Sequence, residues 1–175
     1  MVKKLDIDAF LHNSEGHPLI DVRAPAEFLH GHIPGAISLP LFSDEERAIV
    51  GTLYKQKGRE AAMMKGLEFY GPNMQGLIGD LQKITNQRQL FVHCWRGGMR
   101  SGVVSWMLDL FGYQATVLNK GYKALRRTVL DSFSQTRNVL ILGGKTGSAK
   151  TEIIHELISH QQQVVDLEGV ACHRG

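Results

Sequence analysis

Cys94 lies in the segment of this sequence whose residue types are best suited to chemistry. The residues that follow it form a candidate anion-binding loop: Trp95, Arg96, Gly97, Gly98, Met99, Arg100 and Ser101. A buried-strand pattern over 90–92 precedes the loop and a helical pattern begins at Arg100. The two glycines let backbone N–H groups turn towards the sulfur, and the arginines and the helix N-terminus add positive charge. These features favour a thiolate and predict a reactive cysteine in a pocket suited to a persulfide, a selenide or a tetrahedral oxyanion.

Alternative interpretations exist for the residues of this loop. A lone cysteine is often a buried, inert core residue, but the two glycines and two arginines favour chemistry for Cys94. His93 is either a base for the thiol or a residue that holds the loop, and we favour the structural role. Trp95 is suited to stacking on a base or covering an apolar group of a substrate, whereas Trp106 fits a helix core.

A second candidate anion site follows the apolar run 138–142, which predicts a strand. Its residues are Gly143, Gly144, Lys145, Thr146, Gly147, Ser148, Ala149, Lys150 and Thr151, and a helix pattern continues over 152–160. A strand, a glycine-rich loop and a helix in this order predict a phosphate-binding P-loop, with Lys150 on phosphate oxygens and Thr151 on a magnesium ion if one is bound. Ala149 stands where the pattern usually has glycine, so the loop is alternatively kept for architecture alone. Asp166, after a strand expected at 163–165, is a weaker candidate for a metal or substrate contact.

The rest of the chain alternates short apolar runs with helical patterns, which predicts an α/β fold with a mostly parallel central sheet flanked by helices. Strands are expected at 19–22, 37–39, 90–92 and 115–118, and helices at 25–29, 43–57, 59–70, 74–84, 100–111 and 123–133. A turn at 71–73 divides the third helix from the fourth. The linker around 135–138 predicts two domains, residues 1–134 and an incomplete P-loop domain over 135–175.

Composition narrows the classes of protein to consider. A hydrophobic content of 43% is ordinary for a folded protein, and a net charge of +3 tolerates an anionic partner such as RNA without demanding one. Neither a signal peptide nor a membrane span is expected, which points to the cytoplasm. The cysteines, Cys94 and Cys172, predict neither a disulfide framework nor a zinc site, and Cys172 with His173 offers too few ligands for a metal. No metal site and no tightly bound cofactor are expected.

The N-terminal motifs resemble the rhodanese superfamily. The resemblance rests on 21–23, Glu27 with Phe28, 31–36 and the Cys94 loop, and spans roughly residues 3–133. It implies that Asp21, His32 and Gly35 are determinants of the fold and that the loop cysteine carries sulfur as a persulfide. Sulfur-transferring rhodaneses usually span six residues from the cysteine to the end of the loop, whereas Cys94 to Arg100 spans seven. Cysteine phosphatases of this fold have the longer spacing, so a phosphatase is an alternative.

The Cys94 loop followed by a P-loop is similar to the tRNA 2-selenouridine synthases. The resemblance implies an enzyme that acts on tRNA and replaces sulfur by selenium in 2-thiouridine at the wobble position. It implies selenophosphate as donor, supplied by a selenophosphate synthetase, and a geranylated thiouridine intermediate made from geranyl diphosphate. We expect a truncated form that keeps a folded Cys94 domain and lacks full activity. A sulfurtransferase and a non-catalytic module that binds tRNA or a sulfur carrier are further alternatives.

Overall fold

A computed structural model of the chain describes residues 2–136 and 138–171, with the side chain of residue 168 left aside. The chain divides into two compact units, Met1–Ser134 and Gln135–Gly175, which we describe separately. The expectations for Cys172 and His173 fall outside the described residues. No helix in the described ranges is both long enough and apolar enough to cross a membrane.

The first unit is built on a five-stranded, wholly parallel sheet with the order β1-β5-β4-β2-β3. Its strands are β1 (Lys3–Leu5), β2 (Leu19–Asp21), β3 (Ile37–Ser38), β4 (Gln89–His93) and β5 (Gln114–Leu118). The predicted α/β fold is therefore confirmed. β1 was not expected, because its short sequence carries two exposed lysines and shows no apolar run.

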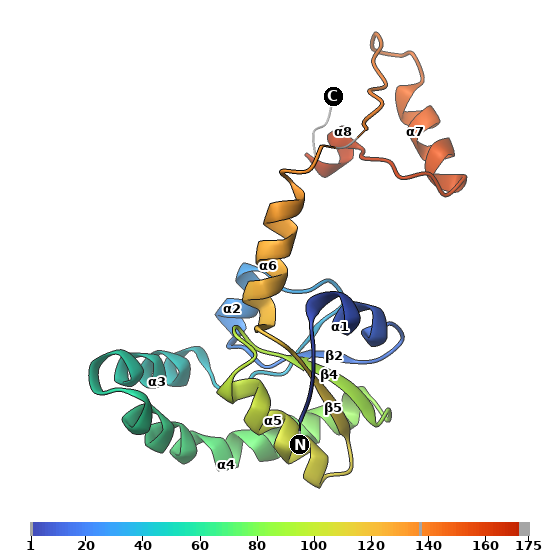
Figure 1. Cartoon of the computed structure of the whole chain (residues 1–175). Helices are drawn as coiled ribbons and strands as arrows, with labels where there is room; N and C mark the ends of the chain where they lie inside the picture. Colours follow the sequence, from blue (N-terminus) through green and yellow to red (C-terminus); the bar gives the residue numbers. More distant parts are fainter. Residues whose placement is uncertain (1, 137, 172–175) are drawn as a thin grey trace. The chain divides into compact units, whose positions relative to one another are not determined.

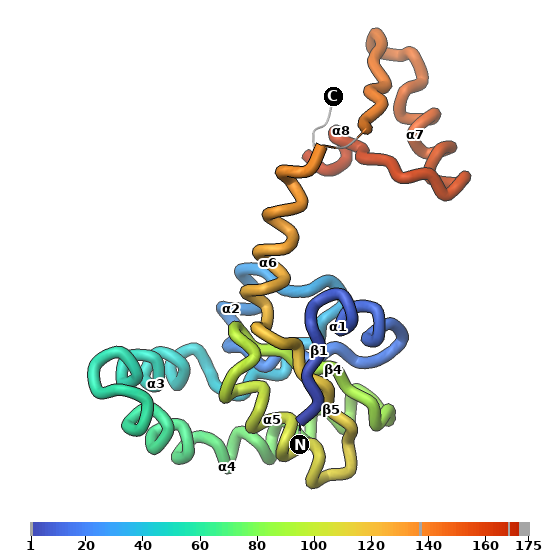
Figure 2. The backbone as a smooth tube through the Cα atoms, in the orientation of Figure 1, coloured from blue at the N-terminus to red at the C-terminus, as the bar shows by residue number. Residues whose placement is uncertain are grey.

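Helices cover both faces of this sheet (Figures 1 and 2). On one face α1 (Ile7–Ser14) and the start of α6 (Gly121–Ser132) pack over Leu19 and Phe91. On the other face α4 (Arg59–Ile84) and α5 (Met99–Leu110) pack over the alternate residues Ile20, Leu90 and Val92. The near-continuous apolar runs of β2 and β4 follow from this burial on two sides.

Two further helices, α2 and α3, come before and after β3 in the chain. α2 (Pro25–His30) begins with a proline at its first turn, as the sequence predicts. α3 (Asp44–Lys57) begins at the predicted capping box, in which Ser43 accepts from the Glu46 N–H and the Glu46 carboxylate accepts from the Ser43 N–H. α3 packs along α4, and Figure 1 shows the two helices running side by side beyond the sheet.

The predicted turn at 71–73 is wrong, because α4 continues through it as one 26-residue helix that contains Pro72. The proline removes one helical hydrogen bond, to the carbonyl of Glu68, and both residues are exposed, so water can satisfy that carbonyl. Buried side chains on both sides of the proline, from Ala62 to Leu81, keep the helix packed against the rest of the unit.

The second unit contains α7 (Lys150–Ser159) and α8 (Leu167–Val170) and no strand among its described residues. The strands predicted at 138–142 and 163–165 are therefore wrong. An apolar run becomes a buried strand only where neighbouring strands bond to it and helices cover it. Here Leu140 is 97% exposed and Ile141 is 87% exposed, and none of the described side chains of this unit is buried.

Candidate active site

Cys94 follows the last residue of β4, at the carboxyl edge of the sheet, and its loop ends where α5 begins at Met99. The side chain is 3% exposed, and its Sγ lies 3.2 Å from the Ser101 hydroxyl oxygen. Burial alone would raise the pKa of the thiol. Hydrogen bonds from the Ser101 side chain and from the backbone N–H groups of Ser101 and Arg96, with the charge of Arg100, lower this pKa below its ordinary value. The sulfur is therefore held in surroundings that favour the thiolate.

The loop is fixed from behind by the turn between β5 and α6. The first N–H groups of α6 donate to it, Tyr122 to the Cys94 carbonyl at 2.9 Å and Lys123 to the Trp95 carbonyl at 3.0 Å. Gly121 has a φ of +62°, and a Cβ on it would lie 2.3 Å from the Cys94 carbonyl oxygen. Gly97, with a φ of +61°, would bring a Cβ to 2.4 Å from the Leu118 carbonyl oxygen. Both contacts exclude any side chain, so the two backbones meet only through glycine.

Arg100 forms a two-pronged ion pair with Glu27 of α2. Its Nη1 donates to Oε2 at 2.6 Å and its Nη2 donates to Oε1 at 3.2 Å. Although burial would raise it, the pKa of Glu27 is lowered by Arg100, by the Ala24 N–H and by Arg47. The pair ties the loop to the first helix after β2 and leaves Arg100 close enough to stabilise negative charge on Cys94.

The buried guanidinium of Arg23 packs against the aromatic residues beside the Cys94 loop. Arg23 is fully buried and donates to both carboxylate oxygens of Asp21 and to the Gly31 carbonyl. Its guanidinium lies 4.0 Å from the centre of the Tyr122 ring, and Trp95 lies against the same ring, with the two ring centres 5.8 Å apart. Trp95 is half-buried and Arg96 is exposed, so both remain available at the mouth of the loop.

His93 is buried beneath the loop, with Nε2 3.7 Å from the Asp21 carboxylate. Burial lowers the pKa of His93 to about 4, which Asp21 only partly offsets. Neither ring nitrogen has a hydrogen-bond partner among the described residues. The ring therefore makes neither a bond to the thiol nor the hydrogen bond by which it was expected to hold the loop; it stacks instead on Tyr122, with the ring centres 6.3 Å apart.

His32 and Gly35, interpreted as determinants of the fold, lie in the segment between α2 and β3. The ring of His32 stacks on Phe28 with their centres 3.9 Å apart, and its Nδ1 is 3.0 Å from the Phe28 carbonyl oxygen. Gly35 has a φ of +78° in the turn closed by the Ala36 N–H on the Ile33 carbonyl. Both residues shape the backbone and neither contacts Cys94.

Gly121 and Tyr122 are site residues that were not expected from the sequence, and Glu27 was noted there only as part of the rhodanese resemblance and not as the partner of Arg100. A glycine between a strand pattern and a helix pattern was the available signal for Gly121, and an acidic residue in the first turn of α2 was the signal for Glu27. Neither signal names its partner in the Cys94 loop, because the contacts join segments far apart in the chain.

The second loop, 143–151, folds around its own lysine. Lys150 donates from Nζ to the carbonyls of Gly144 and Lys145, at 3.1 and 2.9 Å, and Ser148 also donates to the Lys145 carbonyl, at 2.8 Å. Ala149 has a left-handed φ of 54° just before α7 begins. Thr151, the residue expected to reach a magnesium ion, is exposed in the first turn of the helix. Asp166 accepts from the Gly169 N–H at 3.0 Å and so caps α8.

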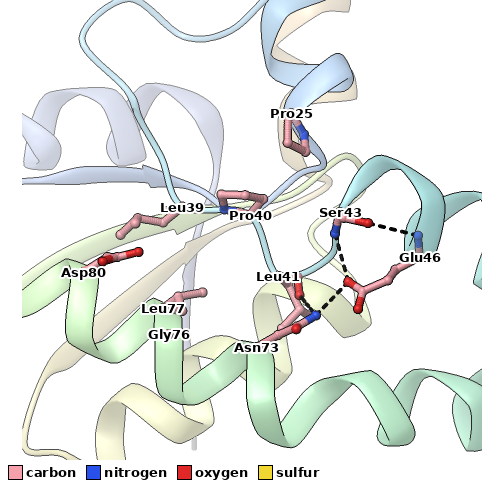
Figure 3. A pocket seen from close by; sticks show the side chains of 10 residues that line it. All are labelled: Pro25, Leu39, Pro40, Leu41, Ser43, Glu46, Asn73, Gly76, Leu77 and Asp80. Atoms are coloured by element: carbon pink, nitrogen blue, oxygen red, sulfur yellow. Dashed lines mark hydrogen bonds between the residues drawn. The ribbon is translucent and has the colours of Figure 1, made fainter.

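A hollow of about 370 Å³ lies between the segment that follows β3 and the helix α4 (Figure 3). Its floor is apolar, and its two acidic residues, Glu46 and Asp80, bond to Asn73 and Lys83 respectively. No basic residue lines it, so it is unsuited to a phosphate or diphosphate. The Cys94 loop, by contrast, contains Arg96 and Arg100.

Comparison with known proteins assigns the class. A family model described as rhodanese-like domain matches residues 6–128, and the chain belongs to this family. A second model, described as the tRNA 2-selenouridine synthase AAA domain, matches residues 137–175. The crystal structure of the N-terminal domain of a protein described as ATP/GTP-binding, from Clostridium difficile 630, superposes with a TM-score of 0.63 at 31% identity. That superposition covers 74% of this chain and 99% of the other.

The curated relatives point to one kind of synthase within that class. The chain is 43% identical, over 90% of its length, to the tRNA 2-selenouridine synthase of Nitrosomonas europaea. It is also 43% identical, over the same share, to the protein of that name from Salmonella arizonae. The matched regions make up 42% and 44% of those relatives, so the chain spans less than half of their length. The similarity to tRNA 2-selenouridine synthases expected from the sequence is confirmed.

Proposed function

We propose that this chain takes part in replacing sulfur by selenium in 2-thiouridine at the wobble position of tRNA, with Cys94 as its reactive residue. The observation that carries the proposal is the buried sulfur of Cys94, which lies 3.2 Å from the Ser101 hydroxyl and whose pKa is lowered by Ser101, by Arg100 and by the Arg96 N–H. The thiolate is the nucleophilic form of cysteine, so these surroundings favour reactivity at Cys94. The names of the relatives supply the tRNA substrate and the selenium chemistry.

In this proposal the residues around Cys94 have separate roles. The N–H groups of Arg96 and Ser101 and the charge of Arg100 keep the sulfur anionic while selenium is delivered from selenophosphate. Trp95, at the mouth of the loop, stacks on the base that carries the sulfur. The sulfur of thiouridine attacks the geranyl carbon and diphosphate leaves, which makes the sulfur a better leaving group. Selenium from selenophosphate then bonds to C2 of the uridine as geranyl thiol leaves, and water cleaves the Se–P bond to release phosphate. The 143–151 loop holds one of the phosphate-bearing substrates, with magnesium at Thr151 if the phosphate brings one. A selenophosphate synthetase supplies the donor, and the setting is the cytoplasm.

The geometry favours this chemistry over a cysteine phosphatase. A phosphatase of this fold needs the arginine at the end of the loop free to bind the phosphoryl group during transfer. In this structure both terminal nitrogens of Arg100 bond to the carboxylate of Glu27. The carboxylate of Glu27 thus already balances the charge of Arg100 and engages two of its five N–H groups, which weakens its attraction for a phosphoryl group.

The decisive assay measures selenium transfer to tRNA that carries 2-thiouridine, with selenophosphate and geranyl diphosphate, by the unaltered chain and by C94S. We expect weak transfer that C94S abolishes, with tRNA binding retained. The transfer of selenium should be weak because the 143–151 loop is exposed and none of the described side chains of its unit is buried. The Nitrosomonas europaea relative serves as positive control. Transfer that survives in C94S, or its absence when the relative is active, would contradict the proposal.

Two other outcomes would identify the rival functions. Hydrolysis of a phosphomonoester that disappears in C94S would indicate a phosphatase, and transfer of sulfur without selenium chemistry would indicate a sulfurtransferase. Binding of tRNA or a sulfur carrier that survives in C94S, with no turnover of any kind, would indicate a binding module. Robust selenium transfer at the rate of the full-length relative would show that the second unit is better organised than its exposure indicates.

A further inference from the structure

α6 carries a row of basic residues that the chemistry at Cys94 does not use. Lys123, Arg126 and Arg127 are exposed, and Lys120 precedes them at the turn into the helix. At 3.6 residues per turn, the three helical cations fall within about 100° of one another around the helix axis. They therefore form one basic face, which we define as Lys123, Arg126 and Arg127.

These cations are mostly without acidic partners. Among the described residues, Lys120, Lys123 and Arg126 form no ion pair, and Arg127 only approaches Asp131 at 3.7 Å in an exposed contact. On α4, by contrast, Lys83 pairs with Asp80, while the exposed Lys55, Lys57 and Arg59 are unpaired among the described residues but lie away from the Cys94 loop, at the tip of the α3–α4 pair. A row of unpaired cations on one face of a helix is the electrostatic footprint of a polyanion.

The basic face starts at the candidate active site. The N–H of Lys123 donates to the Trp95 carbonyl, and the N–H of Tyr122 donates to the Cys94 carbonyl, so the first turn of α6 touches the reactive loop. The basic face covers residues 123–127, about 6 Å along the helix axis at roughly 1.5 Å per residue. That length corresponds to about two nucleotides of a stacked strand at roughly 3.4 Å each, and the long side chains of the three cations extend this reach. Figure 1 shows the later turns of α6 extending away from the sheet.

We propose that the basic face of α6 binds the phosphate backbone of a single RNA strand whose neighbouring base lies at Cys94. This inference rests on the proposed function, because it takes tRNA as the polyanion. Trp95 lies at one end of the face and offers a ring for the base, while the cations hold the adjoining phosphates without reading sequence. The arrangement places the modified base at the loop by binding the nucleotides next to it.

The test compares two triple variants with the same change in charge. K123Q/R126Q/R127Q removes the basic face, and K55Q/K57Q/R59Q removes three exposed cations at the tip of the α3–α4 pair. Binding of an unmodified tRNA transcript is measured against salt concentration for both variants and for the unaltered chain. We expect the α6 variant to bind about tenfold more weakly and to lower the salt slope by about 2, as expected for three lost contacts to a single strand. The tip variant should stay within about twofold of the unaltered chain, and circular dichroism should show all three folded.

The results separate this inference from the proposed function. Equal binding by the α6 variant and the unaltered chain, or equal losses in both variants, would overturn the proposal that the basic face binds RNA. Either result would leave the proposed function standing. An unaltered chain that binds no tRNA would overturn both. Tighter binding to an acidic sulfur-carrier protein than to tRNA, lost in the α6 variant, would overturn RNA as the occupant.

Discussion

The two loops suited to anions differ in what surrounds them. The Cys94 loop lies at the carboxyl edge of a five-stranded sheet and is contacted by α2, α6 and the turn after β5. The 143–151 loop is exposed, and its lysine bonds to carbonyls of the same loop. In the first loop other elements fix the donors around the sulfur. In the second loop the backbone carbonyls accept hydrogen bonds from side chains of the same loop.

This difference teaches that a glycine-rich loop before a helix is only part of an anion site. The backbone of such a loop must be held open by its neighbours before a ligand arrives, or part of the binding free energy is spent on ordering it. Gly97 and Gly121 show how the neighbours do this at Cys94, since each backbone comes too close to the other to admit a side chain. No such contact between elements holds the second loop among the described residues.

The largest effect that the comparison predicts is on stability. G121A places a methyl group 2.3 Å from the Cys94 carbonyl at a φ of +62°, so we expect the free energy of unfolding of the first unit to fall by about 3–5 kcal/mol. G147A is the matched control, because Gly147 also has a positive φ, +79°, but has nothing within 4 Å. It should leave the main transition unchanged in urea unfolding. Similar losses in the two variants would show that the contact with Cys94 is unimportant.

Much of the first unit could be predicted from sequence because its signals are local. The apolar runs of β2, β4 and β5, the capping box at Ser43 and the glycines after Cys94 each follow from neighbouring residues. The strand β1 was not predicted, because an edge strand with exposed lysines has no apolar pattern. The contact of Gly121 with Cys94 and the pair between Glu27 and Arg100 could not be predicted, because they depend on how parallel strands bring separate loops to one edge.

The two strands predicted in the second unit were wrong for a related reason, whereas the helix predicted at 152–160 is present as α7. The run 138–142 has the composition of a buried strand, but burial depends on neighbouring strands that the described residues of this unit do not supply. Pro72 shows the opposite case, in which a local breaker is overridden because the helix has buried contacts on both sides of it. Local sequence therefore predicts an element only as far as its packing partners are present.

Acid should weaken the first unit through His93. Burial lowers the pKa of His93 from 6.5 to about 4, so the unfolded chain takes up a proton below pH 6.5 that the folded chain refuses until about pH 4. The free energy of unfolding should therefore fall as pH drops through this window, by up to about 3 kcal/mol. Urea unfolding of the unaltered chain and of H93N at several pH values measures this. The slope should flatten in H93N, and a slope that persists unchanged would exclude His93 as its source.

A smaller loss of stability should follow from breaking the ion pair that ties α2 to the Cys94 loop. E27Q removes the charge that faces Arg100, and since both side chains are mostly buried we expect a loss of about 2 kcal/mol in unfolding free energy. E68Q is the control, because Glu68 pairs with Lys65 in an exposed contact along α4 and should cost less than about 0.5 kcal/mol. Equal effects would mean that the Arg100 pair is no more than a surface contact.

The smallest predicted change would make the second loop more like the first. Ala149 has a φ of 54°, which glycine adopts without the cost of about 1 kcal/mol that a side chain imposes. Because the exposed loop has to be ordered in this conformation to hold a ligand, A149G should bind inorganic pyrophosphate up to about fivefold more tightly in calorimetry. A171G, at a position with an ordinary φ of −77°, should bring no gain. Weaker binding by A149G would show that Ala149 does not strain the loop.

The central claim, that the fold holds Cys94 as a thiolate, is tested most directly by its rate of alkylation as a function of pH. Iodoacetamide is applied to the unaltered chain and to S101A, each with Cys172 replaced by serine so that Cys94 alone reacts. We predict a midpoint below that of a free thiol, which is near pH 8.5, and a shift to higher pH in S101A because Ser101 no longer bonds to the sulfur through its side chain. A midpoint at or above that of a free thiol in the unaltered chain would contradict the account.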